Sequence, residues 1–296
     1  MSEPVVDVLW TADEAERHAF APGEAAAFLD ILRATTTMTA ALAAGARAVV
    51  AVADPAKALV LRERLTPAPL LAGEERMERR PGFDLGNSPR EFTAERVTGR
   101  TLVMCTTNGT RAAVASLRGG CRRLFAASLR NRAATARALL ADPSVDRITL
   151  ICAGTHGRFS LDDAIGAGAV IEALIGAPGS ATHRPEPTAP SGAAVTPPAA
   201  ARPPTGPRPC RLSDAAVAAL QLWQTARPRL AEALAGCRHG RLLVEAGFAA
   251  DLPVAAAVDA ADFAIAWQPA PDMPEDVGGG WFVPTHFPGN RRTGDR

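Results

Sequence analysis

The chain has 296 residues, of which 47% are apolar, and this is enough to bury a sizeable core. That composition excludes disordered, collagen-like and disulfide-framework proteins. Lysine and arginine total 32 against 31 aspartates and glutamates, so the net charge of +1 excludes a protein drawn to nucleic acid or anionic lipid by its overall charge. Lys57 is the only lysine and tyrosine is absent, so arginine must supply nearly all cationic chemistry.

The cysteines and the N-terminal segment indicate a cytoplasmic protein. The five cysteines form no Cys-x-x-Cys pair and show no regular spacing, so we expect reduced thiols. The first residues lack the basic and apolar regions of a signal peptide. Apolar runs are all shorter than the roughly 18 residues of a membrane span. We therefore expect neither export nor membrane insertion.

Most of the first 176 residues alternate short β-type runs with helical stretches, which indicates an α/β protein. The predicted strands are Val5–Leu9, Ala25–Ile31, Arg47–Ala53, Pro69–Ala72, Thr101–Thr106, Arg122–Ala127 and Arg147–Ala153. The predicted helices are Thr35–Ala44, Pro55–Leu65, Thr110–Leu117, Arg132–Leu140 and Leu161–Ile175. We predict a layered α/β/α architecture with a mixed sheet, arranged as two closely associated lobes.

The rest of the chain divides by composition. Residues 1–176 form the main part of the α/β unit, and residues 177–210 are rich in proline and alanine, as in a flexible insertion. Residues 211–268 then complete the same unit. Their predicted elements are the helices Ser213–Ala235 and Arg238–Ala246 and the strands Leu252–Val258 and Phe263–Trp267. Residues 269–296 are rich in Pro, Gly, Asp and Arg, and we expect a loose tail.

The first candidate site lies at the end of the strand Ala25–Ile31. Asp30 ends the strand, Arg33 follows, and a threonine cluster with Thr35 and Thr36 begins a helix. A carboxylate, a guanidinium, hydroxyls and free helix N–H groups then share one small volume, which suits a phosphate and its metal ion. The structural alternative is that Thr35 caps the helix and Asp30 pairs with Arg33.

The second candidate is the loop after Pro69–Ala72, in which Gly73-Glu74-Glu75-Arg76 leads to GFDLGNSP. Its acidic and amide side chains, Asp84 and Asn87 among them, are oxygen donors that suit Mg²⁺. The alternative is a loop whose polar groups satisfy their own backbone.

The third candidate is the segment TTNGT, between an apolar strand and a helix. The following helix makes this a strand-to-helix turn rather than a hairpin, and Thr107, Asn108 and Gly109 are then donors for an oxyanion. It is not a Walker A loop, because GxxxxGK[ST] is absent.

The fourth candidate is Cys152–Asp163, again a strand, a glycine-bearing loop and a helix start. Ser160 and Asp163 have the spacing of a capping box, which leaves Asp162 freer to bind metal. Both carboxylates could instead serve only the helix dipole. His156 is either a general acid or a solvated loop residue.

The segments DILRATTT, GFDLGNSP, TTNGT and CAGTHGRFSLDD together resemble, in this order, the motifs of the 2-phosphosulfolactate phosphatase family. The likeness covers about Ala25 to Leu174 and resumes from Leu212 to Asp259. It implies a fold peculiar to that family and a Mg²⁺-dependent phosphatase that converts 2-phospho-3-sulfolactate to sulfolactate and phosphate, as in coenzyme M biosynthesis. Where the family reads Gly-Glu-Arg-Gly, this chain reads Gly73-Glu74-Glu75-Arg76, with the arginine shifted by one position.

On this interpretation we assign roles to the residues of the four segments. The expected catalytic residues are Asp30, Arg33, Asn108 and Asp163. The expected substrate-binding residues are Thr35, Thr36, Arg76, Asn87, Thr107, Gly109 and Arg158. The expected Mg²⁺ ligands are Asp30, Asp84 and Asp162, with Asp163 as an alternative to Asp162.

Two questions of mechanism and function stay open at this point. A metal-bound water is the preferred nucleophile because no Ser-His pair or activated cysteine is evident, but a covalent route through Asp30 is the alternative. The expected partner is a small anionic phosphomonoester, with no nucleic acid and no membrane, and homo-oligomerisation stays open. Alternative functions are a phosphatase for another small phosphorylated hydroxy acid, a non-catalytic phosphate-ligand sensor, and a scaffold that recruits an SH3-type domain through the Pro-rich segment.

Overall fold

The computed structural model describes residues 3–176, 209–270, 273 and 279–286, and eleven strands of these residues form one mixed sheet. The strand order from edge to edge is β5-β4-β6-β3-β11-β10-β7-β2-β8-β1-β9. The strands are β1 (Val5–Leu9), β2 (Glu24–Leu29), β3 (Ala48–Ala51), β4 (Leu70–Glu75), β5 (Glu78–Arg79), β6 (Thr101–Cys105), β7 (Leu124–Ala127), β8 (Arg147–Cys152), β9 (Arg211–Leu212), β10 (Ala264–Pro269) and β11 (Gly280–Thr285).

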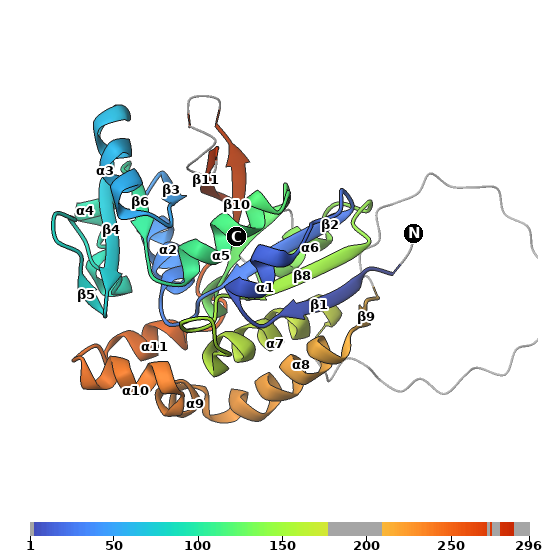
Figure 1. The fold of residues 1–296 in the computed structure, drawn as a ribbon. Coiled ribbons are helices and arrows are strands. Elements are labelled where there is room, and N and C mark those ends of the chain that lie inside the picture. The colour runs from blue at the N-terminus through green and yellow to red at the C-terminus, as the bar shows by residue number, and fades with distance from the viewer. Residues whose placement is uncertain (1–2, 177–208, 271–272, 274–278, 287–296) are drawn as a thin grey trace, which may run out of the picture.

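The sheet contains two blocks of parallel strands that run in opposite directions. β4, β6 and β3 form one block, and β7, β2, β8, β1 and β9 form the other. The antiparallel hairpin β10–β11 lies between them and pairs with β7 on one side and β3 on the other. Figure 1 shows β4 lying across the direction of β1 and β8, as expected when twist accumulates over many strands. Each block with its helices forms one lobe, and the predicted mixed sheet is confirmed.

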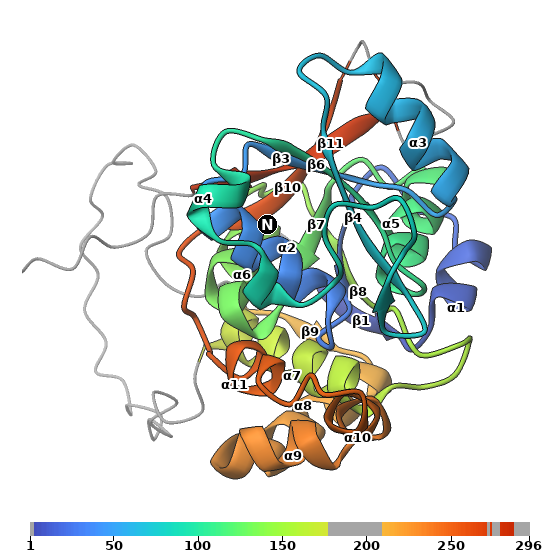
Figure 2. The ribbon, with the colours of Figure 1, turned by 90° about the vertical axis from the view of Figure 1, so that its left-hand side faces the viewer.

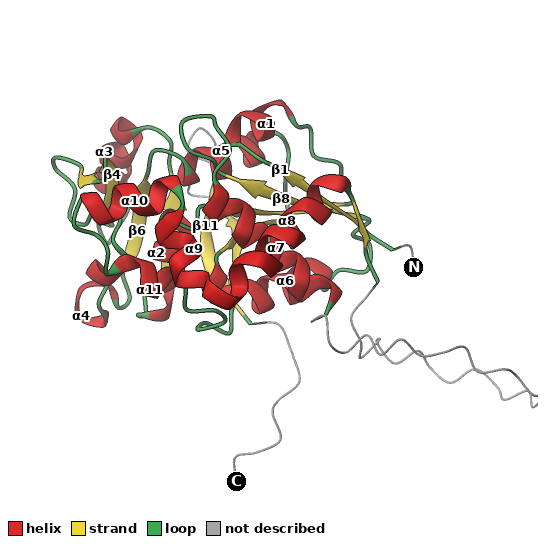
Figure 3. Ribbon diagram, turned by 90° about the horizontal axis from the view of Figure 1, so that it is seen from below, coloured by secondary structure: helices red, strands yellow, loops and turns green. Residues whose placement is uncertain are grey.

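Helices cover both faces of the sheet. α1 and α5 pack on one face of the β7-β2-β8-β1 block, whereas α6 and α7 pack on the other, where α8 lies beside α7 and contacts β1 (Figure 3). The helices are α1 (Ala12–Arg17), α2 (Ala34–Ala43), α3 (Pro55–Arg64), α4 (Ala94–Val97), α5 (Gly109–Arg118), α6 (Arg132–Leu140), α7 (Leu161–Ile175), α8 (Asp214–Ala226), α9 (Leu230–Gly236), α10 (Arg238–Glu245) and α11 (Asp251–Ala255).

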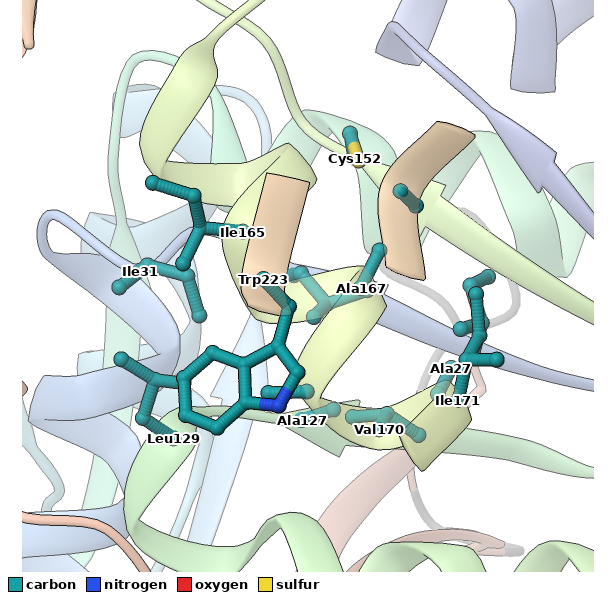
Figure 4. Packing of buried hydrophobic residues seen from close by; sticks show 14 of the residues in the cluster. Ala27, Ile31, Ala127, Leu129, Cys152, Ile165, Ala167, Val170, Ile171 and Trp223 are labelled. Atoms are coloured by element: carbon teal, nitrogen blue, oxygen red, sulfur yellow. The ribbon is translucent and has the colours of Figure 1, made fainter. Parts of the chain in front are cut away.

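β2 is the strand that holds the two layers together, because every one of its residues is buried. Ala27 and Leu29 face the cluster under α7 and α8, whereas Ala26 and Phe28 face the cluster under α1, α2 and α5. In the first cluster Trp223 of α8 lies beside the side chains of Ile31 and Leu129 (Figure 4). Burial on both faces is typical of a central parallel strand, and it fixes the position of Asp30 directly after β2.

The N-termini of α2 and α5 meet in the middle of the molecule. α2 begins just after β2 and α5 just after β6, and both helices contribute to the cluster that the two lobes share. A Cβ atom on Gly109 would lie 2.7 Å from Cβ of Ala34, so only glycine permits this approach. The ends of β2 and β6 therefore open onto one place although their blocks run in opposite directions.

The strands and helices predicted before residue 177 are confirmed, with ends that differ by up to three residues. Two later predictions are wrong. The predicted strand Leu252–Val258 begins instead as the helix α11, because its alanines favour helix and Pro253 lies in the first turn, where no N–H partner is needed. The predicted helix Ser213–Ala235 is divided at Arg227–Arg229, which contains a proline.

The prediction of a loose tail over 269–296 is wrong for residues 280–285, which form β11 in the middle of the sheet. The high proline and glycine content of this region hid the apolar run Trp281–Val283. Residues 287–296, and residues 177–208 of the predicted insertion, lie outside the described residues. In the part of the chain that is described, no helix has both the length and the apolar composition needed to cross a membrane.

Substitution of Phe282 would test whether β11 lies in the middle of the sheet. The Phe282 side chain is 1% exposed and its ring centre lies 5.4 Å from that of Phe28. We expect Phe282→Ala to lower the free energy of unfolding by about 3–5 kcal/mol, because a buried aromatic leaves a cavity. Urea denaturation measures this. The matched control Phe159→Ala removes a half-exposed phenylalanine and should cost no more than about 1 kcal/mol. An equally small effect of both substitutions would contradict a buried β11.

Candidate active site

A pocket of about 260 Å³ opens where the loops after β2, β4, β6 and β8 come together. α10 closes one side of it. The lining residues are Asp30, Leu32, Arg33, Glu74, Glu75, Arg76, Met77, Arg80, Asn87, Thr107, Asn108, Thr155, His156, His239 and Leu242. Residues from all four candidate segments of the sequence therefore share this one pocket.

Hydrogen bonds between the loops hold the walls of the pocket together. Glu74 Oε1, near the end of β4, accepts from the backbone N–H of Thr107 at 3.0 Å and from its hydroxyl at 2.9 Å. Asn108 Oδ1 accepts from the backbone N–H of His156, after β8, at 3.3 Å. The side chains of Glu74 and Asn108 thus join three loops from the two lobes.

Asp30 lies where α2 and α5 begin. Its Oδ1 accepts from the N–H of Ala34 at 3.2 Å, and its carboxylate also accepts from the backbone N–H of Gly109. A Cβ on Gly109 would lie 2.7 Å from Asp30 Oδ2, so a larger residue would displace the carboxylate. Gly109, predicted to bind substrate, therefore acts here by admitting Asp30 to the N-terminus of α5.

Thr35 and Thr36 do not line the pocket, and the structure gives them a structural role instead. The Thr35 hydroxyl donates to the carbonyl of Asp30 and accepts from its N–H, and the Thr36 hydroxyl donates to the carbonyl of Ile31. Both side chains are fully buried. Their predicted contact with substrate is therefore not supported, because their hydroxyls hold the loop that carries Asp30.

Arg33 lines the pocket and forms a buried ion pair that the sequence did not indicate. Its Nη1 lies 2.9 Å from Asp251 Oδ2 at the start of α11, and the other oxygen of Asp251 accepts from the Ser88 hydroxyl at 2.6 Å. The guanidinium also stacks on Phe248 at 4.3 Å. The small helices α9–α11, next to α7 in Figure 2, are thereby attached to the pocket.

Asp162 and Asp163 lie next to the pocket but do not line it. Asp163 accepts backbone N–H groups on both oxygens, from Ile31 and from Gly154, each at 2.9 Å. The predicted capping box is wrong, because Ser160 makes no side-chain cap bond and its hydroxyl donates instead to Asp162 at 2.7 Å. Asp163 thus joins the loops after β2 and β8, and this placement does not support a catalytic role for it.

Asp84 and Arg158 lie away from the pocket. Asp84 Oδ2 accepts from the N–H of Leu71 at 2.8 Å and pairs with Arg62, so its carboxylate serves the fold and is not placed to bind a shared metal. Arg158 is exposed, and its backbone pairs with Thr155 in a small loop. Arg76 does reach the lining from an exposed turn.

Burial and neighbouring charges shift the pKa values of ionisable side chains in and next to the pocket. Burial, together with the charges of Asp162 and Glu74, raises the pKa of Asp30 to about 7, although the N–H groups of Ala34 and Gly109 lower it. Burial likewise raises the pKa of Asp163 well above its usual range. Burial lowers the pKa of His239, so this imidazole is neutral at pH 7.

Sequence reasoning missed several residues of the pocket. Glu74 belonged to a loop whose acidic side chains were expected to suit Mg²⁺, and Arg80 to an arginine-rich stretch that could attract an anion, but neither was named among the expected site residues. His239 and Leu242 come from α10, more than a hundred residues beyond Asn108, so only the tertiary structure could place them here. A lone histidine on a helix carries no local signal of a site.

The donor set suits Mg²⁺ only together with a bound phosphate. In the described residues no three His, Cys, Asp or Glu side chains come together as a ready metal site. The pocket does present carboxylates of Asp30 and Glu74 and the amide oxygen of Asn87, which is buried and has no hydrogen-bond partner among those residues. Mg²⁺ is usually held by one or two carboxylates with water and substrate phosphate oxygens, and this pocket offers such a set.

Comparison with known proteins gives a consistent result. A sequence model of the family described as 2-phosphosulpholactate phosphatase matches residues 10–269. A probable 2-phosphosulfolactate phosphatase of Symbiobacterium thermophilum is 37% identical over 231 residues, which cover 78% of this chain and 85% of the relative. One from Prochlorococcus marinus is 35% identical and covers 76% and 80%. One from Deinococcus radiodurans is 44% identical over 152 residues, or 51% of this chain and 62% of the relative.

The raised pKa of Asp30 predicts a pH dependence of stability. The unfolded chain ionises this carboxyl near pH 4, whereas the folded protein keeps it protonated up to about pH 7, so the free energy of unfolding should fall as pH rises through this range. The shift corresponds to as much as about 4 kcal/mol. Denaturation of wild type and Asp30→Asn in EDTA between pH 4 and 7 measures it. A difference between the two proteins that does not change with pH would contradict the shift.

Two substitutions compare how much the buried ion pair and the partly exposed ion pair contribute to the free energy of unfolding. Asp251→Asn leaves the guanidinium of Arg33 buried without its counter-charge, and we expect a loss of about 3–5 kcal/mol. Asp84→Asn weakens a partly exposed pair with Arg62 and should cost about 1 kcal/mol or less. Equal losses in urea denaturation would show that Arg33 does not depend on Asp251.

Proposed function

Because the chain belongs to the 2-phosphosulfolactate phosphatase family, a family of phosphoric monoester hydrolases, we propose that it hydrolyses 2-phospho-3-sulfolactate to sulfolactate and phosphate with Mg²⁺. The pathway proposed with this reaction is coenzyme M biosynthesis. The observation that carries the proposal is the meeting of the α2 and α5 N-termini at Asp30, inside a pocket that also holds arginines and oxygen donors. Few other arrangements of backbone and side chains suit a phosphate monoester as well.

The phosphate would bind where the two helices begin. Helix N-termini favour an anion through the helix dipole, and the side chain of Asp30 already accepts from the N–H groups of Ala34 and Gly109. Arg33, Thr107 and Asn108 line this part of the pocket. Because Asp251 and Phe248 hold Arg33, its guanidinium is oriented before substrate arrives, and this reduces the cost of binding.

Asp30, Glu74 and Asn87 would hold Mg²⁺ together with the phosphate oxygens. The ion would supply neutralisation of the phosphoryl charge, which hydrolysis of a phosphate monoester strongly requires. The raised pKa of Asp30 belongs to the pocket without the ion, and Mg²⁺ bound to this carboxylate would lower it, so Asp30 would be ionised when it holds the metal. Its second potential role is as nucleophile, and mass spectrometry of enzyme quenched during turnover would detect the phosphorylated Asp30 of that route.

Phosphate release tests the proposal. Purified protein is assayed with 2-phospho-3-sulfolactate, phospholactate, phosphoglycerates and an aryl phosphate, in Mg²⁺ or EDTA. We expect Mg²⁺-dependent release that prefers 2-phospho-3-sulfolactate and falls at least about 100-fold in Asp30→Asn, because the carboxylate at the reacting group is lost. Asp84→Asn is the matched control, since Asp84 lies outside the pocket, and it should keep wild-type activity.

The panel also distinguishes the alternatives. Preference for another ester would retain the phosphatase and replace the substrate. No release from any ester by folded protein would contradict a phosphatase and favour a sensor of phosphorylated ligands. An equal loss of activity in Asp84→Asn and Asp30→Asn would contradict the placement of the active site in this pocket.

A further inference from the structure

We propose that Arg80 is the residue that binds the second acidic group of the substrate, and so selects phosphate esters that also carry a carboxylate or a sulfonate. This inference rests on the proposed phosphatase function but adds a residue that the motifs did not single out. It also replaces Arg76 and Arg158, the two arginines that the sequence favoured for this role.

The backbone of Arg80 is fixed by a hairpin next to the pocket. β4 and β5 are joined by Arg76 and Met77, whose φ angles of 53° and 72° are those of a type I′ turn. Directly after β5, the N–H of Arg80 donates to the carbonyl of Gly73 at 3.3 Å. A Cβ on Gly73 would lie 2.1 Å from the carbonyl oxygen of Cys105, so this glycine keeps the hairpin close to β6. Arg80 therefore enters the pocket from a rigid element.

The guanidinium of Arg80 has an unfilled donor. Its side chain is 16% exposed, and Nη1 lies 3.3 Å from Glu75 Oε2. Nε is buried and has no hydrogen-bond partner among the described residues. Nε–H and one N–H of Nη2 point the same way and form a fork that matches two oxygens of a carboxylate or a sulfonate. Glu75 contacts Nη1, so the described residues leave Nε without a partner.

The other arginines near the pocket are less suited to this role. Arg33 is paired with Asp251 and stacked on Phe248 at the phosphate end. Arg76 is exposed at the tip of the turn. Arg79 does not line the pocket, and its Nη1 donates to the carbonyl of Asp84 at 3.4 Å. Among the described residues, Arg80 thus combines a place in the lining with a buried and unpartnered donor.

Glu75 explains how Arg80 is held while the pocket is empty. Its side chain is 62% exposed, so this carboxylate can leave for solvent at little cost when a ligand anion arrives. Glu75 is then a weak competitor for the ligand. Removing its charge should strengthen the binding of a diacidic ester, whereas removing Arg80 should weaken it.

Kinetics of Arg80→Ala test the proposal with 2-phospho-3-sulfolactate and with p-nitrophenyl phosphate, which has no second acidic group. We expect KM for the first substrate to rise about 10- to 100-fold, as for loss of a charged hydrogen-bonded contact, with kcat within about threefold. kcat/KM for the aryl phosphate should not change. Arg80→Lys should recover only part of the loss, because an ammonium lacks the fork. Glu75→Gln should lower KM for the first substrate.

Arg79→Ala is the matched control, since it removes the same charge one residue away, and it should leave both substrates unaffected. An equal rise in KM for both substrates in Arg80→Ala would overturn the proposal, as would an equal effect of Arg79→Ala or no effect at all. If wild type hydrolyses no ester, calorimetry with sulfolactate and with inorganic phosphate replaces kinetics. Loss of sulfolactate binding alone in Arg80→Ala would then support the role of Arg80, and absence of sulfolactate binding to wild type would overturn it.

Discussion

The burial of the Asp30 carboxylate between the first turns of α2 and α5 is the constraint on which the rest of the structure depends. A carboxylate can be buried there because N–H groups from both helices reach it, and because Gly109 leaves room for it. The contact also joins the two lobes, since α2 follows a strand of one block and α5 a strand of the other. The Asp30 side chain therefore both joins the two lobes and lies in the candidate active site.

Around Asp30, some polar residues stabilise the loops and others of the same kinds face the pocket. Thr35, Thr36 and Asp163 use their polar groups on the backbone of the loops, whereas Glu74, Thr107 and Asn108 keep polar atoms at the pocket wall while they bond to each other's loops. The helices α9–α11 act in the same way from outside, through Asp251 on Arg33. Some lining residues hold one another, as Glu74 does Thr107, and others are held from outside the pocket, as Arg33 is by Asp251.

The sequence predicted most strands and helices before residue 177 because their apolar periodicity and turn residues are local signals, but it missed the short elements α1, β5 and α4. It also assigned Asp30, Asn87, Thr107 and Asn108 to one site, because their segments follow the motif order of a known family. It could not choose between acceptors of the same kind: Asp84 and Asp163 look like ligands until the structure shows that neither lines the pocket. Nor could it find His239 or Asp251, whose relation to the pocket depends on long-range packing.

The hairpin β10–β11 has a consequence for synthesis of the chain on the ribosome. It is made after β3 and β7, yet it fills the middle of the sheet between them. Until it emerges, each of these strands has an open edge, and open edges can pair with other chains. The nascent protein must therefore keep two half-sheets apart from their neighbours until β10 and β11 join them, and translation that stops before β11 is complete leaves a species that is prone to aggregate.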